Sequence, residues 1–318
     1  MKIAITGATG FVGQHLIEEL ISKNLASEKL VIIGRSSIDL PNTTFFKRPI
    51  DKAADYNKAL KSVNVVVHCA ARAHIMNESL EDPLTEFRGI NTFGTLNLAQ
   101  QAAANGVKRF IFISSIKVNG EQTDSGEPFR ANNKNIPTDP YGLSKYEAEV
   151  GLREIAKNTG MEVVIIRPPL VYGPGVKANF SAMIKLASKG WPLPFGGLIH
   201  NQRSLVSVDN LVDLIITCLV HPNAGDEVFL VSDNEDLSTA GMFKRLSVAC
   251  GKTGFLIPIP AFIFKVAFKF MGKANFYQRL CGSLQVDISE TCEKLNWQPP
   301  HKVDVCFART AKYFLENK

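Results

Sequence analysis

Short runs of consecutive apolar residues alternate with segments of helical periodicity through the first half of the chain. Uninterrupted apolar runs predict strands that are buried on both faces, as in a parallel sheet covered by helices. The predicted strands are residues 3–5, 30–33, 44–46, 63–68, 109–113 and 161–167, with helices from 11, from about 83 to 104 and from 141 to about 157. Strands and helices in alternation predict an α/β protein with a doubly wound parallel sheet.

The pattern changes after residue 167. Pro168-Pro169 ends the sixth strand, and proline and glycine become frequent in the residues that follow. Residues 204–232 look like a return to the sheet, with a strand at 205–206, a helix at 209–219 and a strand at 228–231. We therefore predict a first domain of residues 1–167 and 204–232, and a smaller C-terminal lobe of residues 168–203 and 233–318.

One apolar stretch, residues 255–271, bears on whether the chain crosses a membrane. It contains Pro258, Pro260, Lys265 and Lys269, so it is too short between charges and too often broken by proline to span a bilayer. We predict no integral membrane span and an amphipathic helix packed beside a substrate pocket. Docking on a membrane surface is the alternative, through the four phenylalanines Phe262, Phe264, Phe268 and Phe270.

The first strand ends at three glycines spaced three residues apart, and a helix follows. Helix N-terminal N–H groups carry partial positive charge, and glycine lets a pyrophosphate approach the backbone closely. Strand, glycine turn and helix in this order predict a dinucleotide site. Its residues are Gly7, Thr9, Gly10, Phe11, Val12 and Gly13.

Other residues complete the predicted cofactor site. The fourth strand runs into Ala70 and Ala71, small residues that let the backbone pass close under a cofactor. We also assign Asn91, Pro168, Tyr141 and Lys145 to this site. At the end of the second strand, Arg35 stands where an acid would bind a free ribose 2′-hydroxyl and an arginine would accommodate a 2′-phosphate. The sequence therefore predicts NADP(H), with NAD(H) as the alternative.

A tyrosine and a lysine at i and i+4, Tyr141 and Lys145, project from one helix face. The phenol has an ordinary pKa of about 10, and a nearby ammonium group lowers it. The phenol can then exchange a proton with an alcohol or carbonyl while hydride moves to or from nicotinamide. Ser115, at the C-terminal end of the fifth strand, is placed to hydrogen-bond the same oxygen. These three residues are the predicted catalytic group.

Composition narrows the classes of partner. The chain has 318 residues, 45% hydrophobic and 21% charged, and its 36 basic and 30 acidic residues give a net charge of +6 without a dense basic run. This charge favours an anionic small substrate over nucleic acid. Six scattered cysteines without a Cys-x-x-Cys pair predict a reduced, cytoplasmic compartment and no metal site. Because the first strand is predicted so close to residue 1, we expect no signal peptide.

The sequence resembles the extended short-chain dehydrogenase/reductases of the nucleotide-sugar epimerase/dehydratase family. The resemblance covers the whole chain, through Thr6-Gly7-Ala8-Thr9-Gly10, Ser114-Ser115, Tyr141 with Lys145, and Leu295-Asn296-Trp297-Gln298-Pro299. It implies a Rossmann-type fold with a smaller C-terminal substrate lobe, and it implies that Ser115, Tyr141 and Lys145 are catalytic. It also implies a UDP-sugar substrate, and a homodimer formed by the Tyr141-bearing helix and the helix after the fourth strand.

The resemblance also implies residues for the substrate and the adenine. Arg203, in a stretch similar to the family's Arg-x-x-x-x-Val-x-Asp, would bind the diphosphate, and Arg279 lies near the family's second diphosphate arginine. Asn119 stands where the family usually has tyrosine and would contact the substrate. The family's Asp after the third strand is missing, and Asp51 is the nearest substitute.

A further departure separates reaction classes. Sugar 4,6-dehydratases of this family have an Asp-Glu pair directly after the hydroxyl residue, and bifunctional epimerase-reductases have a cysteine there. This chain has Ile116-Lys117. What the resemblance leaves is hydride chemistry at a single carbinol carbon.

Three functions stay open, and the sequence favours the first. This is NADPH-dependent reduction of a UDP-4-keto-6-deoxy-N-acetylhexosamine. Arg35 favours it, as does a resemblance to bacterial enzymes of O-antigen and capsule synthesis. The second is a UDP-sugar 4-epimerase with tightly bound NAD. The third, a non-catalytic Rossmann protein that senses cofactor or binds RNA, is disfavoured because such proteins usually lose the Tyr/Lys pair.

Overall fold

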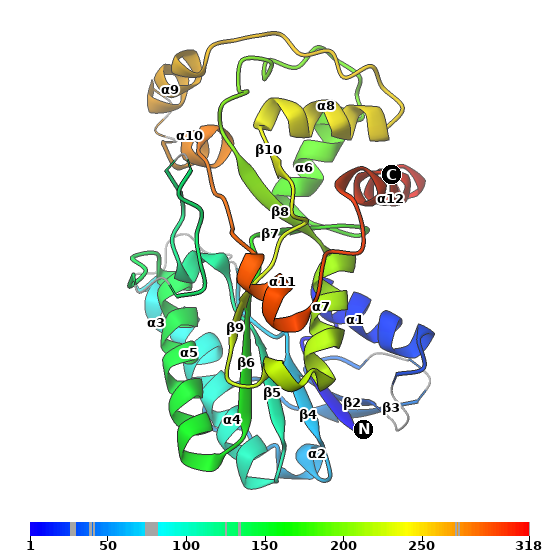
Figure 1. Cartoon of the computed structure of the whole chain (residues 1–318), viewed down its shortest axis with the longest axis vertical. Helices are drawn as coiled ribbons and strands as arrows, with labels where there is room; N and C mark the ends of the chain where they lie inside the picture. Colours follow the sequence, from blue (N-terminus) through cyan, green and yellow to red (C-terminus); the bar gives the residue numbers. More distant parts are fainter. Residues whose placement is uncertain are drawn as a thin grey trace.

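The computed structural model describes residues 1–25, 30–37, 40, 42–73, 82–124, 126–132, 135–270, 272 and 274–317. A seven-stranded parallel sheet forms the lower part of the molecule in Figure 1, in the order β3-β2-β1-β4-β5-β6-β9. Its strands are β1 (Ile3–Thr6), β2 (Leu30–Gly34), β3 (Thr43–Lys47), β4 (Val65–His68), β5 (Arg109–Ile113), β6 (Glu162–Arg167) and β9 (Val228–Leu230). The predicted doubly wound sheet is confirmed.

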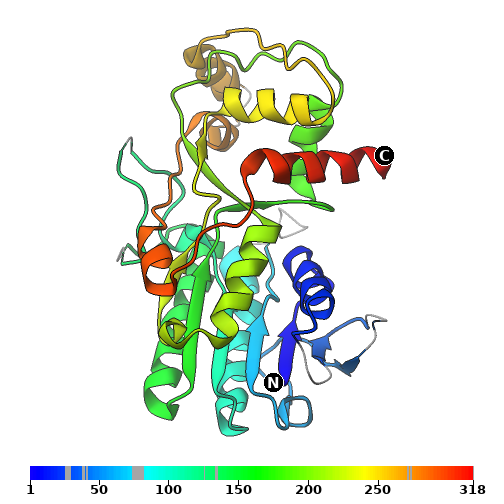
Figure 2. The same cartoon turned by 45° about the vertical axis from the view of Figure 1, so that its right-hand side comes forward.

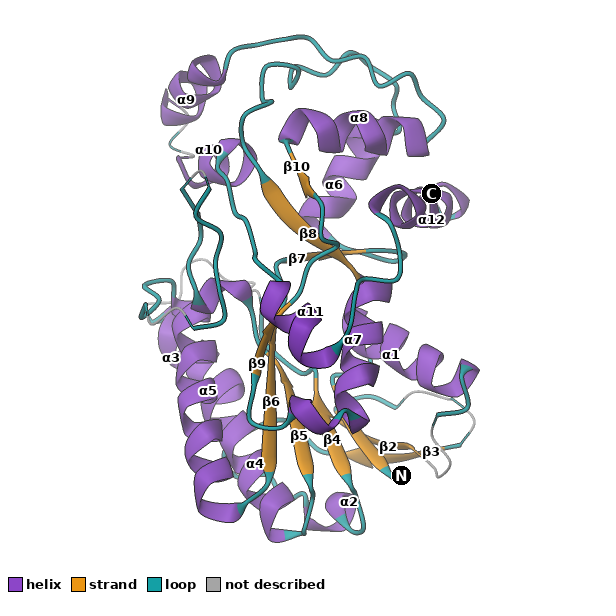
Figure 3. Cartoon of the chain, viewed as in Figure 1, coloured by secondary structure: helices purple, strands orange, loops and turns teal. Residues whose placement is uncertain are grey.

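Helices cover both faces of this sheet, as Figure 3 shows. One face carries α1 (Phe11–Ser22), α7 (Val208–Val220) and α11 (Ser289–Leu295), and the other carries α2 (Asn57–Leu60), α4 (Thr95–Ala104) and α5 (Pro140–Thr159). In β1, Ile3 and Ile5 belong to the first core, whereas Ala4 belongs to the second. Successive side chains of a strand point to opposite faces, so an uninterrupted apolar run buries both.

The helix predicted over residues 83–104 is built in three parts. It comprises α3 (Pro83–Phe87), a π-helical turn η1 (Arg88–Gly94) and α4. Asp82 caps its start by accepting hydrogen bonds from the backbone of Leu84 and Thr85. Other short turns are η2 (Ile116–Val118) and η3 (Pro222–Ala224).

The smaller lobe has a sheet of its own, in the order β10-β8-β7. Its elements are β7 (Leu170–Tyr172), β8 (Arg203–Ser207), β10 (Asp236–Leu237), α6 (Ala178–Ala187), α8 (Thr239–Ala249), α9 (Ala261–Phe270), α10 (Ala274–Cys281) and α12 (Val303–Glu316). Tyr172, Phe180 and Phe307 pack in its core, and α12 runs beside α8 in Figure 2.

The expectation that residues 205–206 rejoin the large sheet is wrong. They lie in β8, which pairs with β7 and β10, whereas α7 and β9 do return to the large sheet. A short apolar strand looks the same in sequence whichever sheet it joins. The domain boundaries stay a prediction. No helix in the described part of the chain combines the length and apolar character needed to cross a bilayer.

Candidate active site

The glycine turn after β1 leaves room for nothing larger than hydrogen at two of its positions. Gly7 has φ +70°, and a Cβ there would lie 2.6 Å from the backbone nitrogen of Ala70 at the end of β4. A Cβ on Gly13 would lie 2.2 Å from the Gly7 carbonyl oxygen, so α1 starts tightly against the turn. β1 and β4 are also the strands at which the strand order reverses, where open α/β sheets bind ligands.

The start of α1 fits a pyrophosphate. Gly10 occupies the N-cap, and no side chain among the described residues caps this end of the helix. Its first N–H groups are therefore available to an anion, with the helix dipole behind them. Thr9 and Gly10 are exposed, and Phe11 and Val12 are half-buried. The residues present thus fit the dinucleotide that the sequence predicts.

Asn91 lies behind the predicted cofactor site. It is fully buried; its amide oxygen accepts from Arg72 N (2.8 Å), and its nitrogen donates to Arg72 O (3.0 Å) and Ser144 Oγ (3.1 Å). This places Asn91 as the support that fixes the Ala70–Arg72 segment against α5. Its amide has no free face for a cofactor in this arrangement.

The remaining predicted cofactor residues lie at strand ends. Arg35 is exposed just after β2, and Ala71 is exposed after β4. Asp51 accepts hydrogen bonds from Ala53 N and Ala54 N, both 2.8 Å, so one carboxylate oxygen caps a backbone turn. The Pro168 carbonyl accepts from Ile116 N at 2.9 Å and ties the end of β6 to the turn after β5.

Ser115, Tyr141 and Lys145 come together at the carboxyl end of β5. Ser115 caps η2 by accepting from Lys117 N at 3.2 Å, and its side chain hydrogen-bonds Tyr141. Lys145 Nζ donates to the Ile113 carbonyl at 2.8 Å and lies 4.3 Å from the centre of the Phe112 ring. Tyr141 packs edge-on against Phe87. The structure thus joins all three predicted catalytic residues in one group.

The titration properties of this group differ from the sequence expectation. Burial, together with the negative charge of Asp139, raises the pKa of Tyr141 to about 12, against the opposing hydrogen bond from Ser115. Burial lowers the pKa of Lys145 to about 7, while the carboxylate of Glu149 favours its charged form. Burial is the largest cause of each shift, because it disfavours both charged forms, the phenolate of Tyr141 and the ammonium of Lys145.

A buried ion pair lies beside Lys145, and the sequence analysis did not identify it. Arg167 donates to Glu149 from Nε (2.9 Å) and Nη2 (2.5 Å), and Ser114 Oγ also donates to Glu149 (2.6 Å). Glu149 and Arg167 are 1% and 3% exposed. The signal was present, since Glu149 follows Lys145 by four residues and so shares its helix face.

Asn119 belongs to this ion-pair network. Its amide oxygen accepts from Arg167 Nη1 at 3.0 Å, and its nitrogen donates to the Arg130 carbonyl at 2.7 Å. It is 2% exposed. Both ends of its amide thus hold protein groups, and the residue anchors the loop that leads from Ser115 to Tyr141. Its contact with the substrate stays a prediction.

The Ile116-Lys117 pair offers neither an acid nor a base. Ile116 is buried, and Lys117 Nζ lies 2.9 Å from carboxylate oxygens of both Asp139 and Glu121. Asp139 is also the N-cap of α5, where it accepts from Gly142 N at 2.7 Å. Lys117 thus holds the carboxylate that positions the helix carrying Tyr141.

Arg203 is half-buried at the start of β8. Its Nη1 donates to the Gly282 carbonyl at 2.9 Å, and burial lowers the pKa of its guanidinium. No carboxylate pairs with it among the described residues. A desolvated cation that lacks an acidic partner suits an anionic ligand group. Arg279 lies exposed on α10.

The segment after α10 links the start of β8, where Arg203 lies, to the loop after Ser115. After α10 the chain pairs with β8, where Leu284 N donates to Gln202 O and Ser204 N donates to Leu284 O. The same segment pairs on its other side with the loop after Ser115, where Phe129 N donates to Gln285 O at 2.9 Å. The smaller lobe and the loop after Ser115 therefore share a backbone connection.

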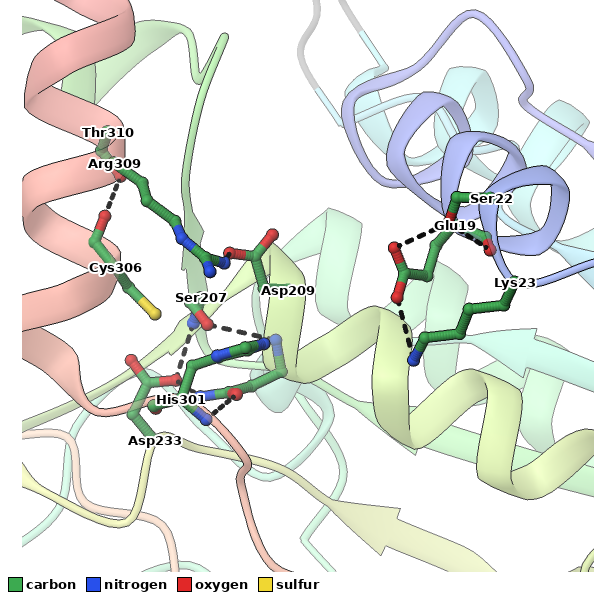
Figure 4. A network of polar contacts seen from close by, with 11 residues as sticks. Glu19, Ser22, Lys23, Ser207, Asp209, Asp233, His301, Cys306, Arg309 and Thr310 are labelled. Atoms are coloured by element: carbon green, nitrogen blue, oxygen red, sulfur yellow. Dashed lines mark hydrogen bonds and ion pairs between the residues drawn. The ribbon is translucent and has the colours of Figure 1, made fainter.

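On another side the two lobes are joined by the polar network of Figure 4. Asp233 accepts from Ser207 N at 2.8 Å and from Asn210 at 2.7 Å, and Arg309 on α12 pairs with Asp209 at 2.9 Å.

A cavity of about 320 Å³ lies beside this network. It is lined by residues of α1, α7 and α12 together with Lys23 and His301, and by none of the predicted site residues. No group of three or more His, Cys, Asp or Glu residues in the described ranges is arranged to hold a metal ion.

Comparison with known proteins gives a family match. Residues 3–232 match the model described as the NAD dependent epimerase/dehydratase family. The chain is 50% identical over 316 residues to a UDP-glucose 4-epimerase of Vibrio cholerae, covering 99% of this chain and 96% of the relative. It is 27% identical over 332 residues to the N-acetyl-α-D-glucosaminyl-diphospho-ditrans,octacis-undecaprenol 4-epimerase of Escherichia coli O157:H7, covering 98% and 95%.

A solved structure shares the whole fold. The UDP-glucuronic acid 4-epimerase of Bacillus cereus in complex with NAD superposes with a TM-score of 0.79, covering all of this chain and 99% of that one at 21% identity. This likeness extends through both lobes and therefore establishes the overall architecture.

Proposed function

The chain belongs to the NAD dependent epimerase/dehydratase family, and we propose that it interconverts the two C4 epimers of a UDP-sugar with NAD held tightly as cofactor. The observation that carries this proposal is that Ser115, Tyr141 and Lys145 lie together, with Ile116-Lys117 directly after Ser115. The chain is also 50% identical to a UDP-glucose 4-epimerase. The group can move a proton at one hydroxyl. Ile116-Lys117 supplies no second acid or base for dehydration or for inversion at C3 and C5.

Each residue has a stated task in this reaction. Bound NAD would supply the acceptor for the hydride from C4 and would return that hydride to the opposite face of the sugar ring. The turn from Gly7 to Gly13 would hold its pyrophosphate. Tyr141 takes the proton of the sugar 4-hydroxyl and gives it back, and Ser115 hydrogen-bonds the same oxygen. Arg203 would bind the diphosphate.

The charge state of Lys145 matters for this chemistry. A phenol with a pKa near 12 is a poor acid and its phenolate is scarce at neutral pH, so a cation beside it is needed to stabilise the phenolate. Glu149 favours the protonated form of Lys145 from within the same helix face. The ion pair with Arg167 fixes Glu149 in that position. We therefore assign Glu149 and Arg167 as positioning residues.

A second candidate is NADPH-dependent reduction of a UDP-4-keto sugar, and Arg35 is the observation that favours it. Its side chain is exposed at the end of β2, where a ribose 2′-phosphate would lie. The same residues would serve, with Tyr141 donating a proton to the 4-keto oxygen. The two candidates differ in whether the cofactor stays bound through the cycle or is exchanged.

The released cofactor tests the choice between them. The purified protein is denatured, and the nucleotides set free are identified and quantified. Stoichiometric NAD is expected for the epimerase. A protein that releases no dinucleotide, and that consumes NADPH when a UDP-4-keto sugar is added, would replace the epimerase with the reductase.

We also infer a homodimer through η1, α4 and α5. Phe93 on η1 and Val150 on α5 are large apolar side chains that are 49% and 40% exposed, on two elements that contact each other. Light scattering after size exclusion should give twice the chain mass. Phe93→Ser should shift the protein toward monomer, whereas Val220→Ser, an exposed position on α7, should not.

A further inference from the structure

Helix α9 presents an apolar face that the other described residues leave uncovered. None of its ten residues is buried, and Phe262 and Phe270 are 66% and 88% exposed. The loop before it adds Phe255 and Ile257, both exposed. We define the α9 surface as these six exposed apolar residues: Phe255, Ile257, Phe262, Ile263, Val266 and Phe270.

The opposite side of α9 holds the helix to the lobe. Phe264 and Phe268 stack at 6.4 Å, and Phe264 stacks on Phe195 at 6.0 Å, which in turn stacks on Phe243 of α8 at 4.4 Å. Along a helix, Phe262, Val266 and Phe270 follow one another at i, i+4 and i+8. The helix is therefore fixed by one aromatic stripe, while a second, apolar stripe faces outward. Figure 1 shows α9 at the end of the molecule farthest from the large sheet.

The charged residues in this part of the sequence all have one sign. Lys265 and Lys269 are exposed and lie, by their helical positions, along one edge of the outward apolar stripe. The sequence has no Asp or Glu between Asp236 and Asp287. An apolar stripe edged by lysines, with no acid in this span, is the composition of helices that lie in the interface of an anionic bilayer.

We propose that the α9 surface docks the protein on an anionic phospholipid bilayer, with the phenylalanines at the acyl boundary and Lys265 and Lys269 against the headgroups. A second copy of the chain fits less well. A two-fold interface is formed by the same patch of both copies, so it would gather Lys265 and Lys269 of each copy with no acid from this span. This inference goes beyond the proposed reaction and does not depend on it.

Docking at α9 would also orient the catalytic region. α10 follows α9, and Gln278 on α10 donates to Gln122 in the loop after Ser115 at 2.9 Å. Thr123 N in that loop donates to Ser283 O at 3.0 Å. These two hydrogen bonds would therefore link a bilayer-bound α9, through α10 and Ser283, to the loop that leads to Tyr141.

The test measures flotation of the full-length protein with phosphatidylcholine vesicles that either contain or lack phosphatidylglycerol. The wild type should float with the anionic vesicles and not with the neutral ones, and added salt should weaken binding. Phe262→Ser with Phe270→Ser, and separately Lys265→Glu with Lys269→Glu, should each weaken binding by about tenfold or more. The matched control is Val220→Ser with Lys312→Glu, which changes an exposed valine and an exposed lysine elsewhere and should bind as the wild type does.

Several outcomes would overturn the proposal. These are no binding of the wild type to anionic vesicles, equal binding of all variants, or loss of a dimer in the phenylalanine variant by light scattering. Thermal unfolding of each variant shows that it is folded. Turnover of a soluble UDP-sugar is measured separately, so failure of vesicle binding and failure of the proposed reaction are distinguishable.

Discussion

The edge of the large sheet that we propose as catalytic differs from the α9 surface in where its charged and apolar side chains lie. At the proposed catalytic edge, Lys145, Glu149 and Arg167 are buried, and each is held by hydrogen bonds within the protein. On α9, Phe262, Phe270 and two lysines are exposed. Buried charges are costly unless they are paired, whereas exposed side chains contribute little to folding. The first region must therefore be intact for stability and chemistry, while the second can change without unfolding the protein.

The largest effect is expected at Tyr141. Tyr141→Phe removes only the hydroxyl that exchanges the proton, so turnover should fall by about 10⁴-fold, the upper end for general acid–base catalysis. The amount of cofactor that co-purifies should stay unchanged, since the glycine turn is untouched. Turnover measured with a UDP-sugar, alongside cofactor content, checks both parts. Wild-type turnover in this variant would remove Tyr141 from the catalytic group.

The next effect concerns stability at the same edge. Arg167→Met leaves the Glu149 carboxylate buried without its partner, which should lower the free energy of unfolding by about 3 kcal/mol or more. Denaturant unfolding measures it. Arg153→Met is the matched control, because Arg153 is 54% exposed and lies 3.7 Å from the same carboxylate. If both variants lost the same small amount, the Glu149–Arg167 pair would not be a structural element.

A pH dependence follows from Lys145. Its pKa is about 7 in the folded chain and near 10.5 when unfolded, so between these values the unfolded chain binds more protons. Stability of the cofactor-free protein should therefore rise with pH across this window, by up to about 1.4 kcal/mol per unit. The difference between wild type and Lys145→Met isolates this contribution. A difference that does not change from pH 7 to 10 would show that Lys145 titrates normally.

The smallest effect is expected on α9. Phe262→Ser with Phe270→Ser should change the free energy of unfolding by no more than about 0.5 kcal/mol per site, because both rings are already exposed. Turnover of a soluble UDP-sugar should also stay close to that of the wild type. A loss as large as that expected for Arg167→Met would mean that α9 is packed against another element in solution, and the contrast between the two regions would fail.

Local patterns predicted much of this molecule. The apolar runs located the strands of the large sheet. The glycine spacing located the turn after β1, where Gly7 and Gly13 allow close backbone contacts. The i, i+4 spacing placed Tyr141 and Lys145 together. These features depend on neighbours in the sequence, which is why the sequence alone was informative.

Long-range partners were beyond such patterns. Whether Leu205 belongs to the large or the small sheet depends on which strand pairs with it, and Asn119 is occupied because Arg167 lies against it in the fold. The low pKa of Lys145 likewise depends on how deeply the fold buries it. Of the four phenylalanines named for the membrane-docking alternative, Phe264 and Phe268 stack in the aromatic stripe that holds α9 to the lobe, and Phe262 and Phe270 are exposed.

The most direct test of the central claim follows UDP-galactose by proton NMR in D₂O, with purified protein and no added cofactor. We expect conversion to an equilibrium mixture with UDP-glucose, and we expect the hydrogen at C4 to be retained, because the hydride leaves and returns without meeting solvent. Because the sugar is itself a proposal, the same measurement includes UDP-N-acetylgalactosamine. No interconversion of either substrate, or deuterium incorporated at C4, would contradict a C4 epimerase that holds its own NAD.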